Sequence, residues 1–487
     1  MKKTCMLSCI LLSLICSACT DGGTVSQTEQ NTDETQVPET TAEDILEFLP
    51  EGIDYGGEEY SILDGQAISF NAGENEVTYK LEDIETGDII AEAVYERTRL
   101  AEEALNIKIV SESVAWDVLG DTISKSVMSG DGAFEAIIGR LSVLVQAITN
   151  GHLLDLGTID TLNLTSPWWD QQVNTSMTVG GKQFVASGDI NYYDDYSITC
   201  MVFNKKLFAD NDIEEPYNLV KEGKWTLDAF YEIINGTAQD VNGDSKYDEH
   251  DFYGYVCNTG MMSSMMIAFN EDLSILDENG VYTINQSTSL LDKATHFATL
   301  MLNNDSVIVE ERKLGYEKGD LLFPNGQALM SQALVGSIVG FRQTMEDDFG
   351  ILPFPKYDVA QETYHNMISQ HWASSAAVPV TCQDTEKVGY VLDTLGCFSP
   401  DTITEAVIET NVMTKSTRDD NSADMLRLIF DTKAFDTSIV YDWGIYNVWC
   451  EITKKTEPQI ASMLEKQENK INKRIADFIA LLETIES

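Results

Sequence analysis

Residues 89–110 read IIAEAVYERTRLAEEALNIKIV and indicate the class of the fold. Apolar and small side chains recur there with helical spacing, from Ile89 through Val94 to Ala101, which predicts a helix. Asn106 and the β-branched residues of 107–110 predict that this helix ends and a strand begins. A helix that leads directly into a strand is typical of α/β layering.

The same alternation continues along the chain. Strands are predicted at 136–138, 184–186, 198–203 and 349–353, and helices at 226–235, 289–302, 386–395, 423–430 and 458–484. Such a pattern predicts open α/β sheets, whose ligands bind beyond the strand ends or between domains.

The composition excludes some classes of protein. The chain has 487 residues, of which 43% are hydrophobic, so it can form two or three domains with a sizeable core. It carries 80 Asp and Glu against 31 Lys and Arg, a formal net charge of -49. Because such a protein repels polyanions, nucleic acid is not expected as a partner.

The N-terminus has the features of an export signal. Lys2 and Lys3 precede an apolar run at 6–15 that is too short to span a bilayer. The run leads into Cys16-Ser-Ala-Cys19, which resembles the lipobox of bacterial lipoproteins. The resemblance implies that 1–19 is a lipoprotein signal peptide and that Cys19 is lipidated, which anchors the chain to the extracellular face of the cell membrane. A CxxC redox pair is the alternative interpretation of the two cysteines.

The segment after the signal is strongly acidic. Residues 21–60 hold 12 acidic residues and no Lys or Arg, so we interpret 20–60 as a flexible tether. Five widely spaced cysteines remain in the part expected to fold, and we expect free thiols there: Cys200, Cys257, Cys382, Cys397 and Cys450.

Several short motifs occur in an order that resembles one family. They are Trp168-Trp169-Asp170, Gly188-Asp189, 201–205, the GKWT of 223–226, the NGQALM of 325–330, the FGILPFPKYD of 349–358, Gln361, Tyr364 and the TRD of 417–419. Together they resemble the extracellular solute-binding proteins of family 1, the lipoprotein receptors of ABC importers.

The resemblance implies a two-lobe periplasmic-binding-protein-like α/β fold of the class II type, with multiple hinge crossings. The expected crossings are near 197–203, 349–354 and 372–380. The first lobe would comprise 61–198 plus 349–375, and the second 199–348 plus 376–487. The implied function is capture of a small solute, a carbohydrate or oligosaccharide, by a monomer that then docks on the ABC permease subunits. A peptide or another small polar solute is the alternative ligand.

Residues 240–251 read DVNGDSKYDEHD and have the register of an EF-hand-type calcium loop. The predicted ligands of a structural Ca²⁺ are Asp240, Asn242, Asp244, Asp248 and Asp251, with the backbone carbonyl of Lys246. Ser245 stands where such loops have Gly, and Asp251 stands where they have a bidentate Glu. An acidic surface turn without an ion is the alternative.

Aromatic residues next to polar ones are candidate sugar contacts, because a sugar offers apolar C–H faces ringed by hydroxyls. Three segments near the expected lobe boundaries supply both kinds of side chain: 188–195, 370–372 and 441–449. The predicted ligand contacts are Asp189, Asn191, Tyr192, Trp372, Trp443 and Tyr446.

We expect no enzymatic activity and predict no catalytic residues. The chain has no GxSxG, HExxH or Walker motif, and its five histidines show no metal-ligand spacing. Two alternatives stay open at this point: a surface polysaccharide-degrading enzyme, which needs only two facing carboxylates, and an adhesive lipoprotein.

Overall fold

The helix and strand predicted from residues 89–110 are both present. A single residue separates helix α2 (Ile89–Leu105) from strand β2 (Ile107–Ala115). Asn106 joins them with φ 48°, a left-handed conformation that Asn tolerates better than most residues. Val94, Ala101 and Leu105 form the buried face of α2.

We describe a computed structural model, in which residues 46–66, 89–278, 280–315, 319, 321–412 and 419–485 are described. The predicted signal peptide, Cys19 and most of the predicted tether lie outside these residues. Within the described ranges, no helix is long and apolar enough to cross a membrane.

The first sheet has the strand order β12-β3-β1-β2, with β1 (Glu58–Gln66), β3 (Ala136–Arg140) and β12 (Ser374–Ala377) beside β2. Strand β1 is parallel to both β2 and β3, and β12 is antiparallel to β3. Successive residues of β1 face opposite sides of the sheet, since Ile62 and Leu63 belong to different hydrophobic clusters. The helices of this lobe are α2, α3 (Trp116–Ser129), α4 (Leu141–Thr149), α5 (Gln171–Met177) and α15 (Thr385–Phe398).

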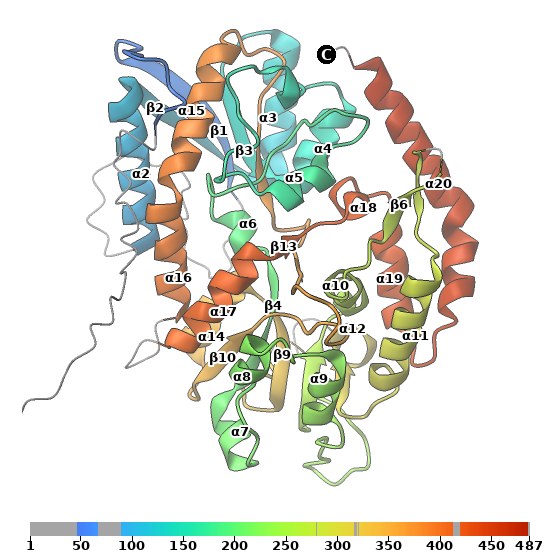
Figure 1. Ribbon diagram of the computed structural model, residues 1–487. Coiled ribbons are helices and arrows are strands. Elements are labelled where there is room, and N and C mark those ends of the chain that lie inside the picture. Colours follow the sequence, from blue (N-terminus) through green and yellow to red (C-terminus); the bar gives the residue numbers. More distant parts are fainter. Residues whose placement is uncertain are drawn as a thin grey trace, which may run out of the picture. The chain divides into compact units, whose positions relative to one another are not determined.

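The second sheet has the order β10-β4-β9-β5-β8. Its strands β10, β4 and β9 are labelled in the lower half of Figure 1. Its strands are β4 (Thr199–Asn204), β5 (Tyr253–Cys257), β8 (Val307–Val309), β9 (Ala328–Leu334) and β10 (Phe349–Leu352). Strand β4 is antiparallel to both of its neighbours, and β5 is parallel to both of its own. A short hairpin of β6 (Ser274–Leu276) and β7 (Tyr282–Ile284) lies apart from this sheet.

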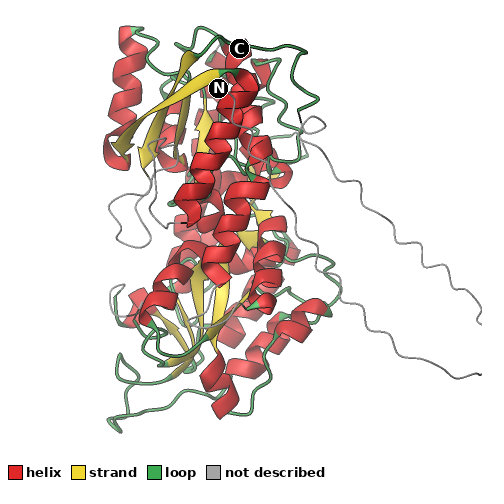
Figure 2. Ribbon diagram, turned by 90° about the vertical axis from the view of Figure 1, so that its left-hand side faces the viewer, coloured by secondary structure: helices red, strands yellow, loops and turns green. Residues whose placement is uncertain are grey.

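Helices surround the second sheet, as Figure 2 shows. Those nearest to it in the sequence are α7 (Lys205–Asp210), α8 (Tyr217–Lys221), α9 (Leu227–Ile234), α10 (Met261–Ala268), α11 (Thr288–Met301), α12 (Glu310–Lys313) and α14 (Ile338–Thr344). The C-terminal helices are α16 (Glu405–Val412), α17 (Asp420–Asp431), α18 (Thr437–Val440), α19 (Ile445–Thr453) and α20 (Ile460–Thr484). Of these, α17 packs against β10 and α19 against α10, whereas α16 packs against α2 and α18 against α4 and α5 of the first lobe. The helix predicted at 458–484 is present as α20, and its apolar residues Leu464, Ile475 and Phe478 are buried on one face.

Two neighbouring segments connect the sheets. Residues 197–199 lead into β4, and Ile198 forms a bridge with Ile368 of the second segment. The backbone N–H of Ser369 donates to the carbonyl of Ser197 at 2.8 Å. Strand β11 (Asn366–Met367) of the second segment pairs with β13 (Lys433–Ala434), so a third part of the chain joins this region. We call 197–199 and 366–373 the crossing segments.

The strand pairing corrects the expected lobe boundaries. We expected 349–375 in the first lobe, but β10 pairs with β4 in the second sheet. We expected 376–487 in the second lobe, but β12 ends at Ala377 in the first sheet and α15 packs against α2. The expected crossing near 349–354 is therefore wrong, and the chain crosses after β10, through 366–373.

The expected tether is also too long at its C-terminal end. Strand β1 begins at Glu58, which pairs with Ile107 of β2. Leu49, Ile53 and Tyr55 pack against the core beside the first sheet. The few apolar residues of this acidic segment thus fold because β2 and α2 supply a surface for them.

Candidate functional site

Three side chains meet at one edge of the first sheet. The parallel strands β1, β2 and β3 end at the same edge, which is where open α/β sheets bind ligands. Trp116 follows β2 directly, Arg140 is the last residue of β3, and Trp372 lies two residues before β12. The antiparallel pairing of Ser374 with Arg140 brings the third of these segments to the same place.

Arg140 lies against both indoles. Its Cζ is 4.3 Å from the centre of the Trp116 ring and 5.2 Å from that of the Trp372 ring, both within the range of cation–π attraction. Its side chain is buried, with 7% of the residue exposed. We call Trp116, Arg140 and Trp372 the Arg140 clamp.

The guanidinium of Arg140 has no counter-charge among the residues that the structure describes. Its Nε and Nη2 atoms are buried and make no hydrogen bond there. Burial lowers the pKa of Arg140, but a guanidinium keeps its proton in proteins, so the clamp holds a positive charge.

A second aromatic pair adjoins the clamp. His371, next to Trp372, packs its ring against Tyr446 with 5.8 Å between the ring centres. Tyr446 lies on α19, which packs against α10 of the second lobe. Burial lowers the pKa of His371. The negative charge of Asp442 raises this pKa and the positive charge of Arg140 lowers it, so both groups act on His371 electrostatically. The site thus draws on both lobes and on a crossing segment.

Two of the six predicted ligand contacts, Trp372 and Tyr446, lie in this region. The other four belong to neither the Arg140 clamp nor the His371–Tyr446 pair. Asn191 is fully buried, where its Oδ1 accepts from the backbone N–H of Tyr193 at 3.0 Å and its Nδ2 donates to the Ser374 carbonyl at 3.4 Å. Tyr192 is buried against Tyr193, with 4.6 Å between ring centres.

Trp443 also lies within a core. It is 2% exposed, and its ring lies 5.3 Å from Tyr282 and 6.1 Å from Phe478 of α20, measured between ring centres. The structure therefore gives Trp443 a packing role and does not bring it to the Arg140 clamp.

Asp189 lies at the edge of a buried charge cluster formed by Asp170, Asp189, Asp194, Asp195 and Lys433, which we call the Lys433 cluster. The Nζ of Lys433 is 2.8 Å from Asp170 Oδ2, 3.0 Å from Asp195 Oδ1 and 3.7 Å from Asp194 Oδ2. These groups come from the start of α5, from α6 (Tyr193–Tyr196) and from β13, so the cluster ties the first lobe to the crossing region.

The Lys433 cluster has more carboxyl groups than cations. Burial raises the pKa of Asp189 to about 7, although Lys433 opposes the rise. Burial likewise raises the pKa of Asp194 and of Asp195. Burial alone would lower the pKa of Lys433, but the surrounding carboxylates outweigh it and the pKa lies well above its ordinary value. The arrangement suits a structural tie, because Lys433 is engaged by its own carboxylates.

The predicted calcium loop lies between α9 and β5. Ser245 has φ 65°, the positive value that a glycine usually provides there. The carboxylate of Asp240 accepts from the backbone N–H groups of Gly243 and Ser245, and that of Asp251 from Val241 and Asp248. No three His, Cys, Asp or Glu side chains in the described ranges lie close enough to hold a metal ion. The carboxylates of 240–251 as they stand do not form a cage for Ca²⁺, and binding stays a prediction.

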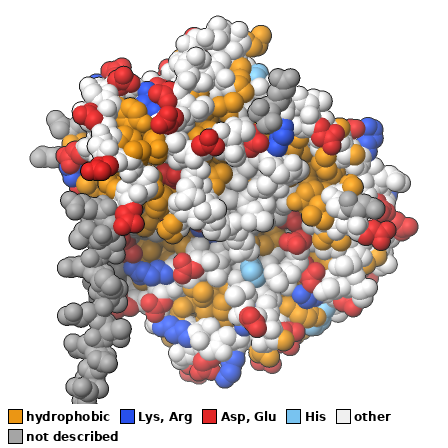
Figure 3. All heavy atoms as spheres, turned by 45° about the horizontal axis from the view of Figure 1, so that its top comes forward, with side chains coloured by type: hydrophobic (Ala, Val, Ile, Leu, Met, Phe, Trp, Pro, Cys, Tyr) orange, Lys and Arg blue, Asp and Glu red, His pale blue; other side chains and the backbone are white. Residues whose placement is uncertain are grey.

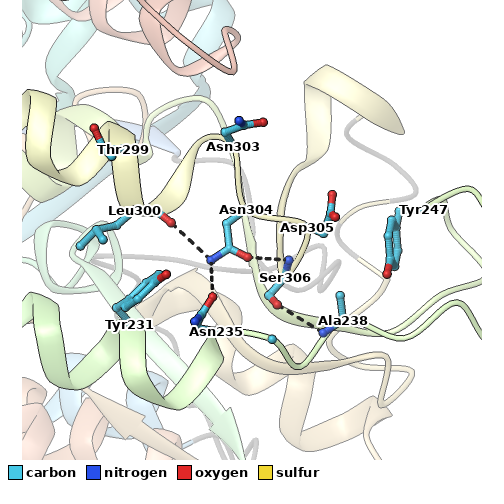
Figure 4. A pocket seen from close by; sticks show the side chains of 11 residues that line it. Tyr231, Asn235, Ala238, Tyr247, Thr299, Leu300, Asn303, Asn304, Asp305 and Ser306 are labelled. Carbon is cyan, nitrogen blue, oxygen red and sulfur yellow. Dashed lines mark hydrogen bonds between the residues drawn. The ribbon is translucent and has the colours of Figure 1, made fainter.

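A pocket of about 410 Å³ lies on the second lobe, between the ends of α9 and α11 (Figure 4). Its amides bond to one another: Asn304 Nδ2 donates to Asn235 Oδ1 at 3.3 Å, and Asn304 Oδ1 accepts from the Ser306 N–H at 2.9 Å. These bonds tie two loops together. The pocket includes no residue of the Arg140 clamp.

Sequence reasoning missed Trp116 and Arg140. Each is a large polar or aromatic residue placed directly at the end of a β-branched or apolar run, 107–115 for Trp116 and 136–139 for Arg140. Position at a strand end was the available signal, because ligands of α/β sheets bind there. The cysteine prediction is confirmed for the five cysteines of the described part, all of which are free.

No protein-family model and no curated protein matches the chain. Solved structures do match it. A cyclic α-maltosyl-1,6-maltose binding protein from Arthrobacter globiformis has a TM-score of 0.56 and 16% identity, over 87% of this chain and 100% of that one. An ABC substrate-binding protein from Listeria monocytogenes, in complex with cycloalternan, has a TM-score of 0.53 and 12% identity, over 86% and 99%.

A de novo designed esterase also matches, with a TM-score of 0.57 and 14% identity, over 86% of this chain and 99% of that one. The other similar structures are mostly described as substrate- or saccharide-binding proteins. At these identities the likeness establishes the architecture alone. The chain has the two-lobe α/β fold of maltose-binding-protein-like solute-binding proteins.

Proposed function

We propose that this chain is the lipid-anchored, extracellular substrate-binding protein of an ABC importer and that it captures a saccharide between its two lobes. The observation that supports this most directly is the Arg140 clamp at the carboxyl edge of the first sheet, next to the His371–Tyr446 pair. A site that draws on both lobes can bind a solute more tightly when the lobes close.

The chemistry of the site suits a saccharide. Indole and phenol rings present flat apolar faces to the C–H faces of a sugar, and the N–H groups of Arg140 and His371 can donate to its oxygens. The proteins from Arthrobacter and Listeria that share the fold are described with glucose-based cyclic oligosaccharides. This supports the solute class without identifying the solute.

The crossing segments supply the means of closure. They are short and lie side by side, so small changes in backbone dihedral angles at 197–199 and 366–373 would rotate one lobe relative to the other. The solute can shift this equilibrium only by its preference for the closed arrangement. The closed form would then dock on the permease subunits as a monomer.

The anchor and the location outside the cell rest on the sequence of residues 1–19 and on Cys19. Metabolic labelling with a fatty acid tests them, since label should enter the chain and be lost in a Cys19→Ser variant. An unlabelled parent chain would remove the anchor and leave saccharide binding untouched.

A thermal-shift panel of mono- and oligosaccharides tests solute capture. The expected result is that one class of saccharide raises the melting temperature of the purified chain and is recovered unchanged afterwards. Cleavage of the saccharide during incubation would support the alternative, a surface polysaccharide-degrading enzyme. A panel without any shift would refute saccharide binding.

A further inference from the structure

We propose that the saccharide bound by this protein is acidic and that Arg140 binds its carboxylate or sulfate group. This inference rests on the proposed function, because it places an anionic saccharide in the same site. It is carried by the geometry of the Arg140 clamp. The Arg140 residue is 7% exposed, its guanidinium lies against two indoles, and two of its buried nitrogen atoms make no hydrogen bond within the described residues.

Arg140 differs from the other arginines of the described part. Each of those donates at least one hydrogen bond to a protein oxygen, namely Arg97, Arg99, Arg312, Arg342, Arg427 and Arg474. No side-chain hydrogen bond or ion pair joins the guanidinium of Arg140 to any residue in the same ranges. A buried, charged donor without an acceptor is costly, so its retention indicates an acceptor supplied from outside the chain.

The two indoles do not satisfy Arg140. Cation–π attraction acts through the ring faces and leaves the five N–H donors of the guanidinium unused. A carboxylate or a sulfate accepts two of these donors side by side, the geometry for which arginine is better suited than lysine. Sugar hydroxyls would accept hydrogen bonds but would leave the positive charge without a partner in a site of low dielectric constant.

The charge of the whole chain strengthens the argument. In a chain with 80 acidic residues, an arginine without a carboxylate nearby is unexpected. Figure 3 shows Asp and Glu side chains spread over the face of the molecule that it draws. Two acids near β3 have other partners: Asp64 of β1, which pairs with Ile138, accepts from the hydroxyl of Ser113, and Glu135, just before β3, pairs with Lys387. The guanidinium of Arg140 therefore places a positive charge at the site, although the chain as a whole has a formal net charge of -49.

Paired saccharides test the inference on the full chain. The probes are a galacturonic acid trimer and its methyl ester, and a sulfated and an unsulfated disaccharide, each titrated calorimetrically. We expect one acidic member to bind roughly 10- to 100-fold more tightly than its neutral counterpart, the effect of charged hydrogen bonds. The carboxylate and sulfate arms distinguish the two acidic groups.

Variants identify the group responsible. Arg140→Met should remove the preference for the acidic member, Arg140→Lys should restore part of it, and Arg427→Met, which removes an exposed ion pair with Glu405, should leave it unchanged. Thermal unfolding without ligand supplies a second readout. Arg140→Met should melt at the same or a higher temperature, because it removes an unpaired buried charge.

The outcomes separate this inference from the proposed function. Binding of neutral saccharides with no acidic preference would overturn the inference and leave saccharide capture intact. Binding of no saccharide would overturn both. A clear loss of thermal stability in Arg140→Met without ligand would show that Arg140 has a partner within the chain, and would overturn the inference alone.

Discussion

Lys433 Nζ lies 2.8 Å from Asp170 Oδ2, although the two residues are far apart in the sequence. Lys433 is in β13, and Asp170 directly precedes α5. This contact, with those to Asp194 and Asp195, places one cation among several buried carboxyl groups. It joins the first lobe to the segment that pairs with β11.

Lys433→Met should therefore destabilise the protein by about 3–5 kcal/mol, because it leaves buried carboxylates without their cation. Urea unfolding followed by circular dichroism measures the change. Lys473→Met is a matched control on the exposed face of α20, where the lysine pairs with Asp477 and should contribute nothing measurable. Equal stabilities for the two variants would show that the cluster is not a tie.

The raised pKa of Asp189 predicts a pH dependence of stability. Asp189 has a pKa of about 7 in the folded protein against 3.8 for the ordinary carboxyl group, so the folded state holds the proton where the unfolded state has lost it. The contribution of Asp189 to stability is fully present below about pH 4 and is lost as the pH rises through 7. Asp189→Asn keeps a neutral side chain and should flatten this part of the stability profile. An unchanged profile would contradict the raised pKa.

Trp372 and Trp443 should respond in opposite ways to replacement by alanine. Trp372→Ala should weaken saccharide binding at least about 10-fold by removing the hydrophobic face, with a smaller effect on stability. Trp443→Ala should cost about 3–5 kcal/mol of stability, since the ring is buried, and should leave the affinity of the folded protein unchanged. Calorimetry and urea unfolding of both variants check this pair, and a reversed pattern would move the site toward α20.

Calcium binding to residues 240–251 remains a prediction with a direct test. Titration of the purified, chelator-treated chain with Ca²⁺ should release heat with one-to-one stoichiometry, and Asp244→Ala should abolish it. The Asp240 and Asp251 carboxylates now accept backbone hydrogen bonds, so the loop must rearrange and the affinity should be modest. Absence of heat from the parent chain would favour the alternative, an acidic surface turn.

Local patterns predicted the elements well, and pairings between distant segments explain the errors. The helix and strand of 89–110 follow from side chains within the segment itself, and so does the buried stripe of α20. The lobe assignment of β10 depends on its partner, β4, which local periodicity does not specify.

The candidate site was only partly predictable for the same reason. Trp372 was predicted from its aromatic and polar neighbours. Arg140 was not, because its two indole contacts come from distant segments, one directly after β2 and one just before β12. Trp443 had the same local features as Trp372, yet Phe478 of α20 covers it. Sequence context indicates which residues could stack on a sugar, and the packing of remote helices decides which of them remain accessible.

A crystal structure of the full chain grown with the saccharide that binds most tightly tests the central claim most directly. The account predicts one saccharide between the lobes, stacked on Trp372 and within hydrogen-bonding distance of Arg140, with groups of both lobes in contact and its glycosidic bonds intact. A saccharide held by one lobe only, for example in the pocket beside Asn304, or a cleaved product in the site, would contradict it.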